Sequence, residues 1–293
     1  MATATVRARS RSKRQQISFG SVLLSLILTA LAAFMLLPLV YMVSTAFKPL
    51  DELFLWPPRF FVQHPTLDNF SSLIVATSAL AVPFSRYIFN STFVAIIAVT
   101  LIVVLASMAA YPLAKDKSLP GRQFIFTTII AALMFAPEVT QIPRYIIVDA
   151  LGMIDTYWAL ILPQVASAYA LFLMKQFIEQ LPDEILEAAR IDGASEARIF
   201  WQIIMPLARP AWATLTIITF IATWNEFFGP LIFTRSEAMR TLPLAVRTIG
   251  GETIARQGAA AAATLVTTLP PIIVFALFRR RVMETMAHSG IKG

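Results

Sequence analysis

Six apolar runs, each close to the length that crosses a membrane, constrain the fold of this chain more than any other feature. A helix needs about 20 apolar residues to span a hydrocarbon core of about 30 Å. Four runs contain no charged residue, and each of the other two holds one carboxylate, Glu138 or Glu226. The runs cover residues 21–47, 87–114, 123–143, 156–174, 210–234 and 257–278. They predict an all-α integral membrane protein with six transmembrane helices.

The composition supports this prediction and excludes several other classes of protein. The chain is 57% hydrophobic and 14% charged, whereas a soluble domain carries about 25% charged residues. Its net charge of +7 does not indicate nucleic-acid binding, because the Lys and Arg residues flank apolar runs, where they fix orientation and meet anionic lipids. The absence of Cys excludes disulfides and thiolate metal sites.

The distribution of basic residues predicts the orientation. Loops on the cytoplasmic side of a membrane carry an excess of Lys and Arg. With six spans, the two termini and two of the loops share one side, and that side holds 16 of the 24 Lys and Arg residues. We therefore expect a plasma or inner membrane protein with both termini in the cytoplasm. Residues 1–20 form a basic tail, and the run after it is too long for the apolar core of a cleaved signal peptide, so residues 21–293 form one six-span permease-like domain.

A charged segment at about residues 180–208 interrupts the apolar pattern between the fourth and fifth runs. An acidic start at Asp183 suits the positive end of a helix dipole, and Gly193 suits the left-handed turn that ends a helix. Ser195 can cap a second helix, which Pro206 would end or bend. The segment predicts a helix, a sharp turn and a second helix. Its periodicity alone is compatible with a helix that docks on a partner protein and with an amphipathic connection at the lipid surface.

The stretch "EAARIDGASEARIFWQIIMP" resembles the cytoplasmic-loop signature of ATP-binding-cassette importer permeases. That signature is Glu-Ala-Ala, a Gly after three residues, and Ile-x-Leu-Pro after nine more, and Met205 here stands in the place of Leu. "LPDEILEAARIDGAS", "TWNEFFGPLIF" and the terminal "SGIKG" further resemble the carbohydrate, maltose-type branch, specifically its second membrane subunit. The residues that the signature implies for ATPase coupling are Glu187, Ala188, Ala189, Asp192, Gly193, Ile203 and Pro206.

The resemblance implies a fold, a mechanism and a set of partners. It implies the type I importer permease fold, with the loop helix seated in a cleft of an ATPase dimer whose closure moves the membrane helices. It also implies a second permease subunit and an extracytoplasmic solute-binding protein. The chain contains no Gly-x-x-x-x-Gly-Lys-Ser/Thr phosphate loop, so ATP and Mg would bind the separate ATPase chain. We expect no cofactor, no metal and no enzymatic activity in this chain.

Four residues are candidates for lining the translocation path of the substrate. Carboxylates inside spans are rare and by default suggest function, and a sugar path needs aromatic faces with amide or carboxylate acceptors. Aromatic side chains in spans also serve as packing or interface anchors, so both uses stay open. The candidates are Glu138, Trp224, Asn225 and Glu226. Prolines in or near the spans would kink helices to open a central cavity, and neighbouring helices can satisfy the carbonyls that they free; these are Pro137, Pro143, Pro163, Pro270 and Pro271. The small residues of "ASMAA" and "GAAAAA" would permit close packing.

Two other functions compete with a sugar importer. Permeases for glycerol phosphate or polyols share many of the same sequence motifs, and the charge of the substrate would distinguish such an importer from a sugar importer. A stand-alone secondary carrier usually depends on titratable residues at mid-membrane and on inverted repeats, and it would leave the charged segment unexplained.

Overall fold

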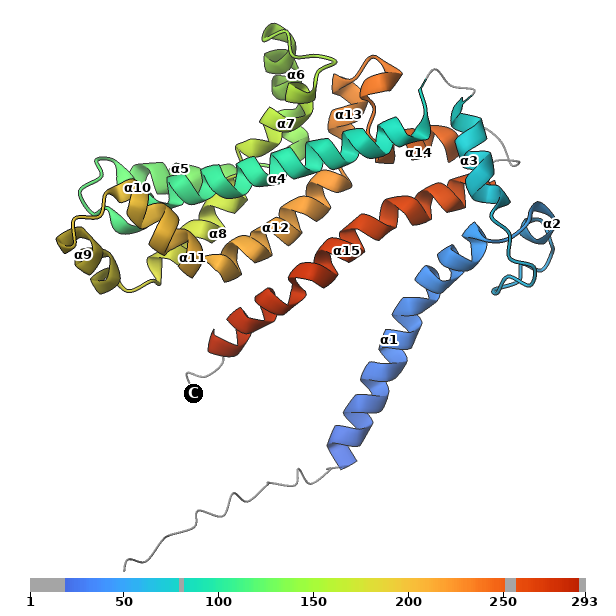
Figure 1. Ribbon diagram of the computed structural model, residues 1–293, viewed down its shortest axis with the longest axis horizontal. Coiled ribbons are helices and arrows are strands. Elements are labelled where there is room, and N and C mark those ends of the chain that lie inside the picture. The colour runs from blue at the N-terminus through green and yellow to red at the C-terminus, as the bar shows by residue number, and fades with distance from the viewer. Residues whose placement is uncertain (1–18, 79–81, 251–256, 290–293) are drawn as a thin grey trace, which may run out of the picture.

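The computed structural model describes residues 19–78, 82–250 and 257–289, and every regular element in this part of the chain is a helix (Figure 1). Most of the predicted basic tail and the last four residues of the terminal "SGIKG" lie outside the described residues. The elements are α1 (Phe19–Ala46), α2 (Leu50–Leu53), α3 (Asp68–Ser78), α4 (Phe84–Lys115), α5 (Arg122–Leu133), η1 (Pro137–Thr140), α6 (Gln141–Ala150), α7 (Tyr157–Val165), α8 (Ala168–Glu179), α9 (Asp183–Ile191), α10 (Glu196–Ile199), η2 (Phe200–Ile204), α11 (Met205–Leu207), α12 (Arg209–Trp224), α13 (Phe228–Phe233), η3 (Glu237–Met239), α14 (Leu242–Gly250) and α15 (Gln257–Ser289).

Three helices, α1, α4 and α15, are individually long and apolar enough to cross a membrane. The other three predicted runs are not single helices. The runs at 123–143 and 156–174 fall on bent pairs, with bends of 100° between α5 and α6 and 43° between α7 and α8. The run at 210–234 begins with α12, which is bent by 75° from the preceding α10–α11 run, and continues past the end of α12 into α13. Among the described residues the chain therefore has three spans, or up to six if each bent pair is one span.

Local sequence explains the break within each of the three bent pairs. Ala136, at the first break, is extended with ψ 136°, as expected for a residue that precedes proline. At the second break the Ser167 hydroxyl accepts a hydrogen bond from the Ala170 N–H and starts a new helix. The third break falls at Ala208, directly before the Arg209–Pro210 start of α12, where proline is favoured. The hydropathy of the chain alone does not indicate where these helices break.

The helix α4 runs nearly the whole length of the bundle and packs against α7, α8 and α12 (Figure 1). Its contact face carries small residues, including Ala106 and Ala110 of the predicted "ASMAA" surface, and both are buried. They pack in one cluster with Met174 of α8 and Leu215 of α12. Small side chains let helix backbones approach closely, which favours association within a membrane. The predicted packing role of this stretch is confirmed.

The helix α15 packs against α1, α3, α12 and α14, and its residues Ala262 and Ala263 are fully buried, which confirms the packing role of "GAAAAA". Pro271 lies inside this helix and has no N–H to donate to the carbonyl of Thr267, four residues earlier. The indole N–H of Trp224 donates to that carbonyl at 2.8 Å. A neighbouring helix thus satisfies a carbonyl that a proline has freed, as expected.

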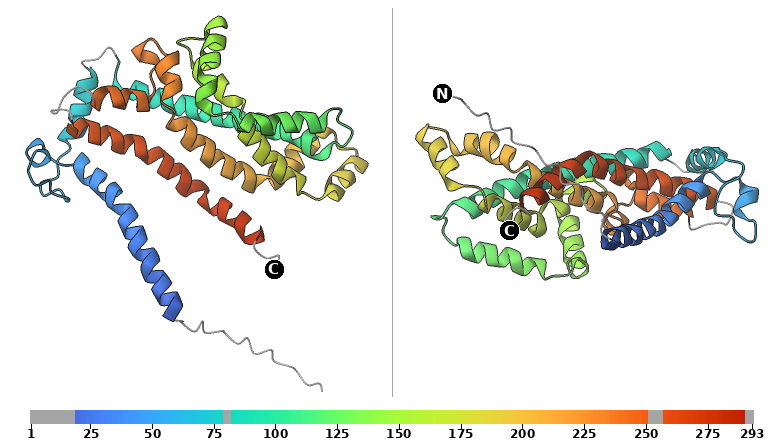
Figure 2. Two further views of the ribbon diagram at one scale, coloured as in Figure 1. Left: turned by 180° about the vertical axis from the view of Figure 1, so that it is seen from behind. Right: turned by 90° about the horizontal axis from the view of Figure 1, so that it is seen from below.

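The two ends of the bundle are formed by different elements (Figure 2). The turn between α9 and α10 lies at one end, together with the last turn of α4, and we call this the α9 end. The short helices α2, α3 and α14 lie at the opposite end, which we call the α3 end. The most apolar window of α1 has no buried residue, so its side chains face the surroundings of the bundle.

Candidate functional site

The segment from α9 to α10 has the predicted helix–turn–helix form. The amide of Gly193, with φ 78°, donates to the carbonyl of Arg190, and the amide of Ala194 donates to the carbonyl of Ala189, each at 3.0 Å. These two bonds form the Schellman motif that closes a helix through a left-handed residue. The hydroxyl of Ser195 then accepts the Arg198 N–H, so the predicted cap is confirmed.

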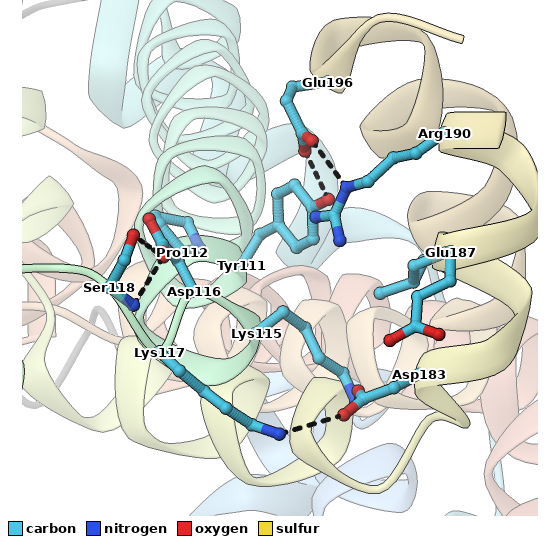
Figure 3. A pocket seen from close by; sticks show the side chains of 11 residues that line it. Tyr111, Pro112, Lys115, Asp116, Lys117, Ser118, Asp183, Glu187, Arg190 and Glu196 are labelled. Atoms are coloured by element: carbon cyan, nitrogen blue, oxygen red, sulfur yellow. Dashed lines mark hydrogen bonds and ion pairs between the residues drawn. The ribbon is translucent and has the colours of Figure 1, made fainter. Parts of the chain in front are cut away.

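A pocket of about 660 Å³ lies between this segment and the end of α4 (Figure 3). The α4 side of the pocket is formed by the last residues of that helix and by the short loop after it. Its lining residues are Tyr111, Pro112, Lys115, Asp116, Lys117, Ser118, Asp183, Leu186, Glu187, Arg190 and Glu196. The two walls come from segments that are about 70 residues apart in the chain and that sequence proximity does not relate.

One hydrogen-bond network joins α4 to α10. The phenol of Tyr111 donates to Oε2 of Glu196 at 2.6 Å, and Nε of Arg190 donates to Oε1 of the same carboxylate at 2.9 Å. Hydrogen bonds to an ionised carboxylate are stronger than neutral ones. The hydrogen bond to Glu196 raises the pKa of Arg190 above its usual value, so the guanidinium stays charged at every physiological pH.

A second network joins α4 to the start of α9. Nζ of Lys115 donates to Oδ1 of Asp183 at 2.6 Å and also to the backbone carbonyls of Glu179 and Leu181. This hydrogen bond and the lysine charge lower the pKa of the Asp183 carboxyl. Lys117 contributes a longer ion pair of 3.8 Å to the same carboxylate. The turn before α9 is therefore fixed to the last residue of α4.

Glu187 faces the same pocket, but it has no ion pair within the described part of the chain. Figure 3 shows its carboxylate pointing into the space between α9 and α4. On the outer face of the same helix Ile191 is 86% exposed, while Leu186 is buried against the bundle. The segment thus presents an available carboxylate beside an exposed apolar residue, which suits a protein partner better than water.

The other residues of the signature divide between support and surface. Ala189 and Ile203 pack against the buried cluster that includes α4, α8 and α12, whereas Ala188, Asp192 and Pro206 are exposed. The predicted bend is present, but it falls at Ala208, two residues beyond Pro206. The residues of the signature therefore lie in one surface element, which Ala189 and Ile203 anchor to the buried cluster.

The path candidates do not form one cluster. Trp224 is buried, with 3% exposure, and its ring stacks on Phe220 at 5.6 Å, so it is a core residue. The Asn225 amide donates to the carbonyl of Ile221 in its own helix. Glu226 accepts the Gly229 N–H at 2.8 Å and caps the start of α13. Asn225 and Glu226 follow the end of α12, so Glu226 lies in a helix break and not within a continuous span.

Glu138 is the candidate with the most open surroundings. It lies in η1, in the break between α5 and α6, and it lines a pocket of about 520 Å³. Gln141 and Tyr145 of α6 and Phe228 of α13 contribute to the same pocket. The side chain of Glu138 is exposed and makes no hydrogen bond within the described residues.

The sequence analysis missed the anchoring residues at the end of α4. Tyr111 and Lys115 lie one helical turn apart at the end of an apolar run, so they share a face. That spacing was the available signal. Arg122 was also missed, and its guanidinium donates to the carbonyls of Leu113 and Ala114, which satisfies carbonyls that the end of α4 leaves without partners.

These features define a multi-pass helical membrane protein with an anchored, amphipathic helix–turn–helix at one end. A family model described as "Binding-protein-dependent transport system inner membrane component" matches residues 102–285. The chain belongs to this family. Its homologues are carbohydrate permeases of ATP-binding-cassette transporters, which are not enzymes, so the predicted resemblance is confirmed.

Individual relatives cover most of the chain. Protein LplC of Bacillus subtilis (strain 168) is 30% identical over 92% of this chain and 93% of its own length. The arabinooligosaccharides transport system permease protein AraQ of Halalkalibacterium halodurans is 30% identical over 96% of this chain and 100% of its own length. The sn-glycerol-3-phosphate transport system permease protein UgpE of Yersinia enterocolitica is 39% identical over 71% of this chain and 74% of its own length.

One solved structure has the same fold. It is the crystal structure of a bacterial ABC transporter involved in the import of the acidic polysaccharide alginate. The match has a TM-score of 0.79 with 21% sequence identity, and it covers 94% of this chain and 99% of that one. At this identity the likeness establishes the fold alone.

Proposed function

We propose that this chain is one of two permease subunits of an ATP-driven importer for a sugar or oligosaccharide. In this proposal the chain crosses the membrane six times, with both termini in the cytoplasm. It forms the translocation path with a second permease and couples to an ATPase dimer, which holds ATP and Mg. The α9 end is then cytoplasmic, and the α3 end faces an extracytoplasmic solute-binding protein.

The observation that carries the proposal is the α9 surface. Its backbone is closed by a Schellman turn and its inner face is anchored to the bundle through Leu186, while Glu187 is exposed at the pocket beside α4 and Ile191 is exposed on the outer face. A surface that is already ordered loses little conformational entropy on binding. The available carboxylate suits a basic side chain of the ATPase, and the apolar residue suits a hydrophobic cleft. We propose Gly193 as the turn and Glu187 as the principal contact.

The pocket that contains Glu138 is the part of the chain that best suits a polyhydroxylated substrate. It combines a carboxylate, the amide of Gln141, the phenol of Tyr145 and the ring of Phe228. Sugars need acceptors for their hydroxyl groups and apolar surfaces for their ring faces, which these residues supply. We propose that Glu138 lines the path. Trp224 and Glu226 act in packing and helix capping instead.

A glycerol phosphate importer is the second candidate, because the UgpE relative has 39% identity over the region that it matches. A phosphate ester carries negative charge, and an ionised carboxylate in its path would repel it. The position of Glu138 in the pocket with Gln141 and Tyr145 therefore favours a neutral sugar. A stand-alone secondary carrier is disfavoured, since the family is binding-protein-dependent.

The proposal is tested with the assembled transporter in proteoliposomes, with its binding protein outside and ATP inside. Glu187→Arg places a cation where the proposal puts a basic ATPase residue. We expect uptake to fall by at least tenfold, the size of a 1.4 kcal/mol change, while the assembly or its coupling to ATP hydrolysis weakens.

Glu184→Arg is the matched control. Glu184 is an exposed carboxylate of the same helix that does not line the pocket, so uptake should stay within about twofold of the wild type, as for a surface change. Equal loss of uptake in both variants, or in neither, would contradict the assignment of Glu187. Uptake without ATP by the purified chain alone would overturn the whole proposal.

A further inference from the structure

We infer that α4 transmits displacement directly between the ATPase-binding segment and the α3 end, and that Tyr111 and Asn90 are the positioning residues at its two ends. The inference rests on the proposed function, in which α9 binds the ATPase. What is added to that function is a route of transmission through α4. In the chain α9 and α10 lie between α8 and α12, yet their side chains are hydrogen-bonded to α4.

At the α9 end, α4 holds both halves of the segment. Tyr111 donates to Glu196 of α10 at 2.6 Å, and Lys115 donates to Asp183 of α9 at 2.6 Å. The Nζ of Lys115 is largely shielded, since its side chain is 6% exposed, so water competes little for this contact. A displacement of α9 and α10 therefore acts on α4 first.

At the α3 end, α4 holds the segment between α13 and α14 in a similar way. Asn90 is fully buried, and its amide donates to the carbonyls of Ala238 and Arg240, each at 2.8 Å. Its carbonyl oxygen accepts the phenol of Tyr157 at 2.8 Å. The neighbouring Ser91 hydroxyl accepts the amide of Leu242, the first residue of α14, at 2.7 Å.

Between these two sets of contacts α4 is one unbroken helix. The 21 residues from Asn90 to Tyr111 correspond to about 32 Å at 1.5 Å per residue. The bent pairs α5–α6 and α7–α8 can absorb a displacement at their breaks, whereas an unbroken helix passes it on. Of the three long helices, α1 and α15 pack mainly against each other and against α2, α3, α12 and α14. In the described structure α4 thus connects the two ends.

This arrangement has the physical form of a coupling element, because both ends act on the same rigid body. The segment at residues 234–242 includes the short turn η3 and is held by side-chain contacts from α4. Binding of a partner there would shift α4, and α4 would shift the pocket that presents Glu187. Because coupling between sites is reciprocal, closure of the ATPase would also move the 234–242 segment.

The test measures basal ATP hydrolysis, its stimulation by the loaded binding protein, and uptake, all with the complete transporter. Tyr111→Phe keeps the ring and removes only the hydroxyl. We expect basal hydrolysis within twofold of the wild type, and a fall of about tenfold in stimulation and uptake, the size expected from one hydrogen bond to a charged group.

Substitutions of Glu196 separate the hydrogen bond from the charge. Glu196→Gln keeps an oxygen that accepts the Tyr111 proton, and it loses mainly a solvent-exposed ion pair with Arg190, which contributes little. Its effect should be smaller than that of Tyr111→Phe, because the hydrogen bond is kept but is weaker to a neutral amide than to a carboxylate. Glu196→Ala should behave like Tyr111→Phe, and the two changes combined should cost no more than one. Lys117→Ala, at an 84% exposed side chain of the same pocket, is the control.

The far end is tested in the same assay. Asn90→Ala removes both donors, and Ser91→Ala is the milder alternative, because it removes only the acceptor for the Leu242 amide. Each should reduce stimulation while basal hydrolysis persists. Full stimulation in Tyr111→Phe, beside a loss in Glu187→Arg, would overturn the route through α4 and leave the proposed function intact. No effect of Glu187→Arg would instead contradict the proposed role of Glu187, and ATP-independent uptake by the purified chain would refute the proposed function.

Discussion

The contact between Trp224 and the proline-containing helix allows a quantitative test of whether this residue serves the core or the transport path. Pro271 leaves the Thr267 carbonyl without its helical donor, and the Trp224 indole N–H supplies one at 2.8 Å. Trp224→Phe keeps an aromatic ring in the core and removes the donor. An unsatisfied buried acceptor costs about 1–3 kcal/mol, and within membranes such bonds rarely exceed about 1.7 kcal/mol. We expect a loss of about 1–2 kcal/mol in the free energy of unfolding.

The second half of the test changes the proline. Pro271→Ala restores a backbone N–H that can donate to the Thr267 carbonyl within the helix. In that background the indole donor is redundant, so Trp224→Phe should cost less than about 0.5 kcal/mol, and the two changes should couple by about 1 kcal/mol. The assay is a titration of the purified chain with SDS in mixed micelles, followed by circular dichroism.

Trp158→Phe is the matched control, because Trp158 is 54% exposed and its indole N–H makes no hydrogen bond within the described residues. It should change the unfolding free energy by less than about 0.5 kcal/mol. An equal cost of Trp224→Phe in both backgrounds would refute the role of the freed carbonyl. Unchanged stability with a specific loss of sugar uptake would place Trp224 in the path after all.

Three further predictions concern backbone fit and charge. Gly258→Ala should destabilise the chain by about 1–3 kcal/mol in the same titration, because the new Cβ would lie 2.7 Å from Cγ of Asn69, whose amide is held by two carbonyls; full stability would contradict this fit. Gly193→Ala should cost only about 1–2 kcal/mol from its left-handed backbone, since its Cβ would meet nothing within 4 Å, and a loss above about 3 kcal/mol would contradict that. The pKa of Asp183 is lowered by Lys115, so the ion pair stabilises the fold while Asp183 is ionised. The difference in thermal stability between the wild type and Asp183→Asn should therefore be constant from pH 8 to 5 and disappear as the pH falls below 3.8 through the lowered pKa. A difference that persists in acid would refute the ion pair.

Sequence reasoning predicted well wherever local chemistry decides the structure. The acidic start at Asp183, the turn at Gly193 and the cap at Ser195 each depend on neighbouring residues only, and all three occur as expected. The apolar runs likewise located the helices. The family signature added the functional interpretation of the same segment, and family membership supports it.

Prediction failed where hydropathy hides backbone breaks. The run at 210–234 contains no strong breaker between Trp224 and Phe228, yet the helix ends there, and Glu226 caps the next helix instead of lying within a span. The contacts of Tyr111 with Glu196 were also beyond reach, because they join residues 85 positions apart. Such a pairing depends on how α4 packs against α8 and α12, which periodicity does not specify.

The function of the charged segment therefore depends on the contacts that fix it to the rest of the bundle. In the proposed importer, the exposed residues of this segment can transmit motion from the ATPase only if their own position is fixed to the membrane helices. The segment is joined to α8 by the short turn before α9 and to α12 through the helical α10–α11 run and the bend at Ala208, and a turn or a bend can yield when the segment is displaced. Tyr111 and Lys115 supply two separate polar contacts to the one long helix of the core. In the proposed importer, loss of either contact should therefore leave a folded, inserted permease that binds the ATPase but responds to it weakly.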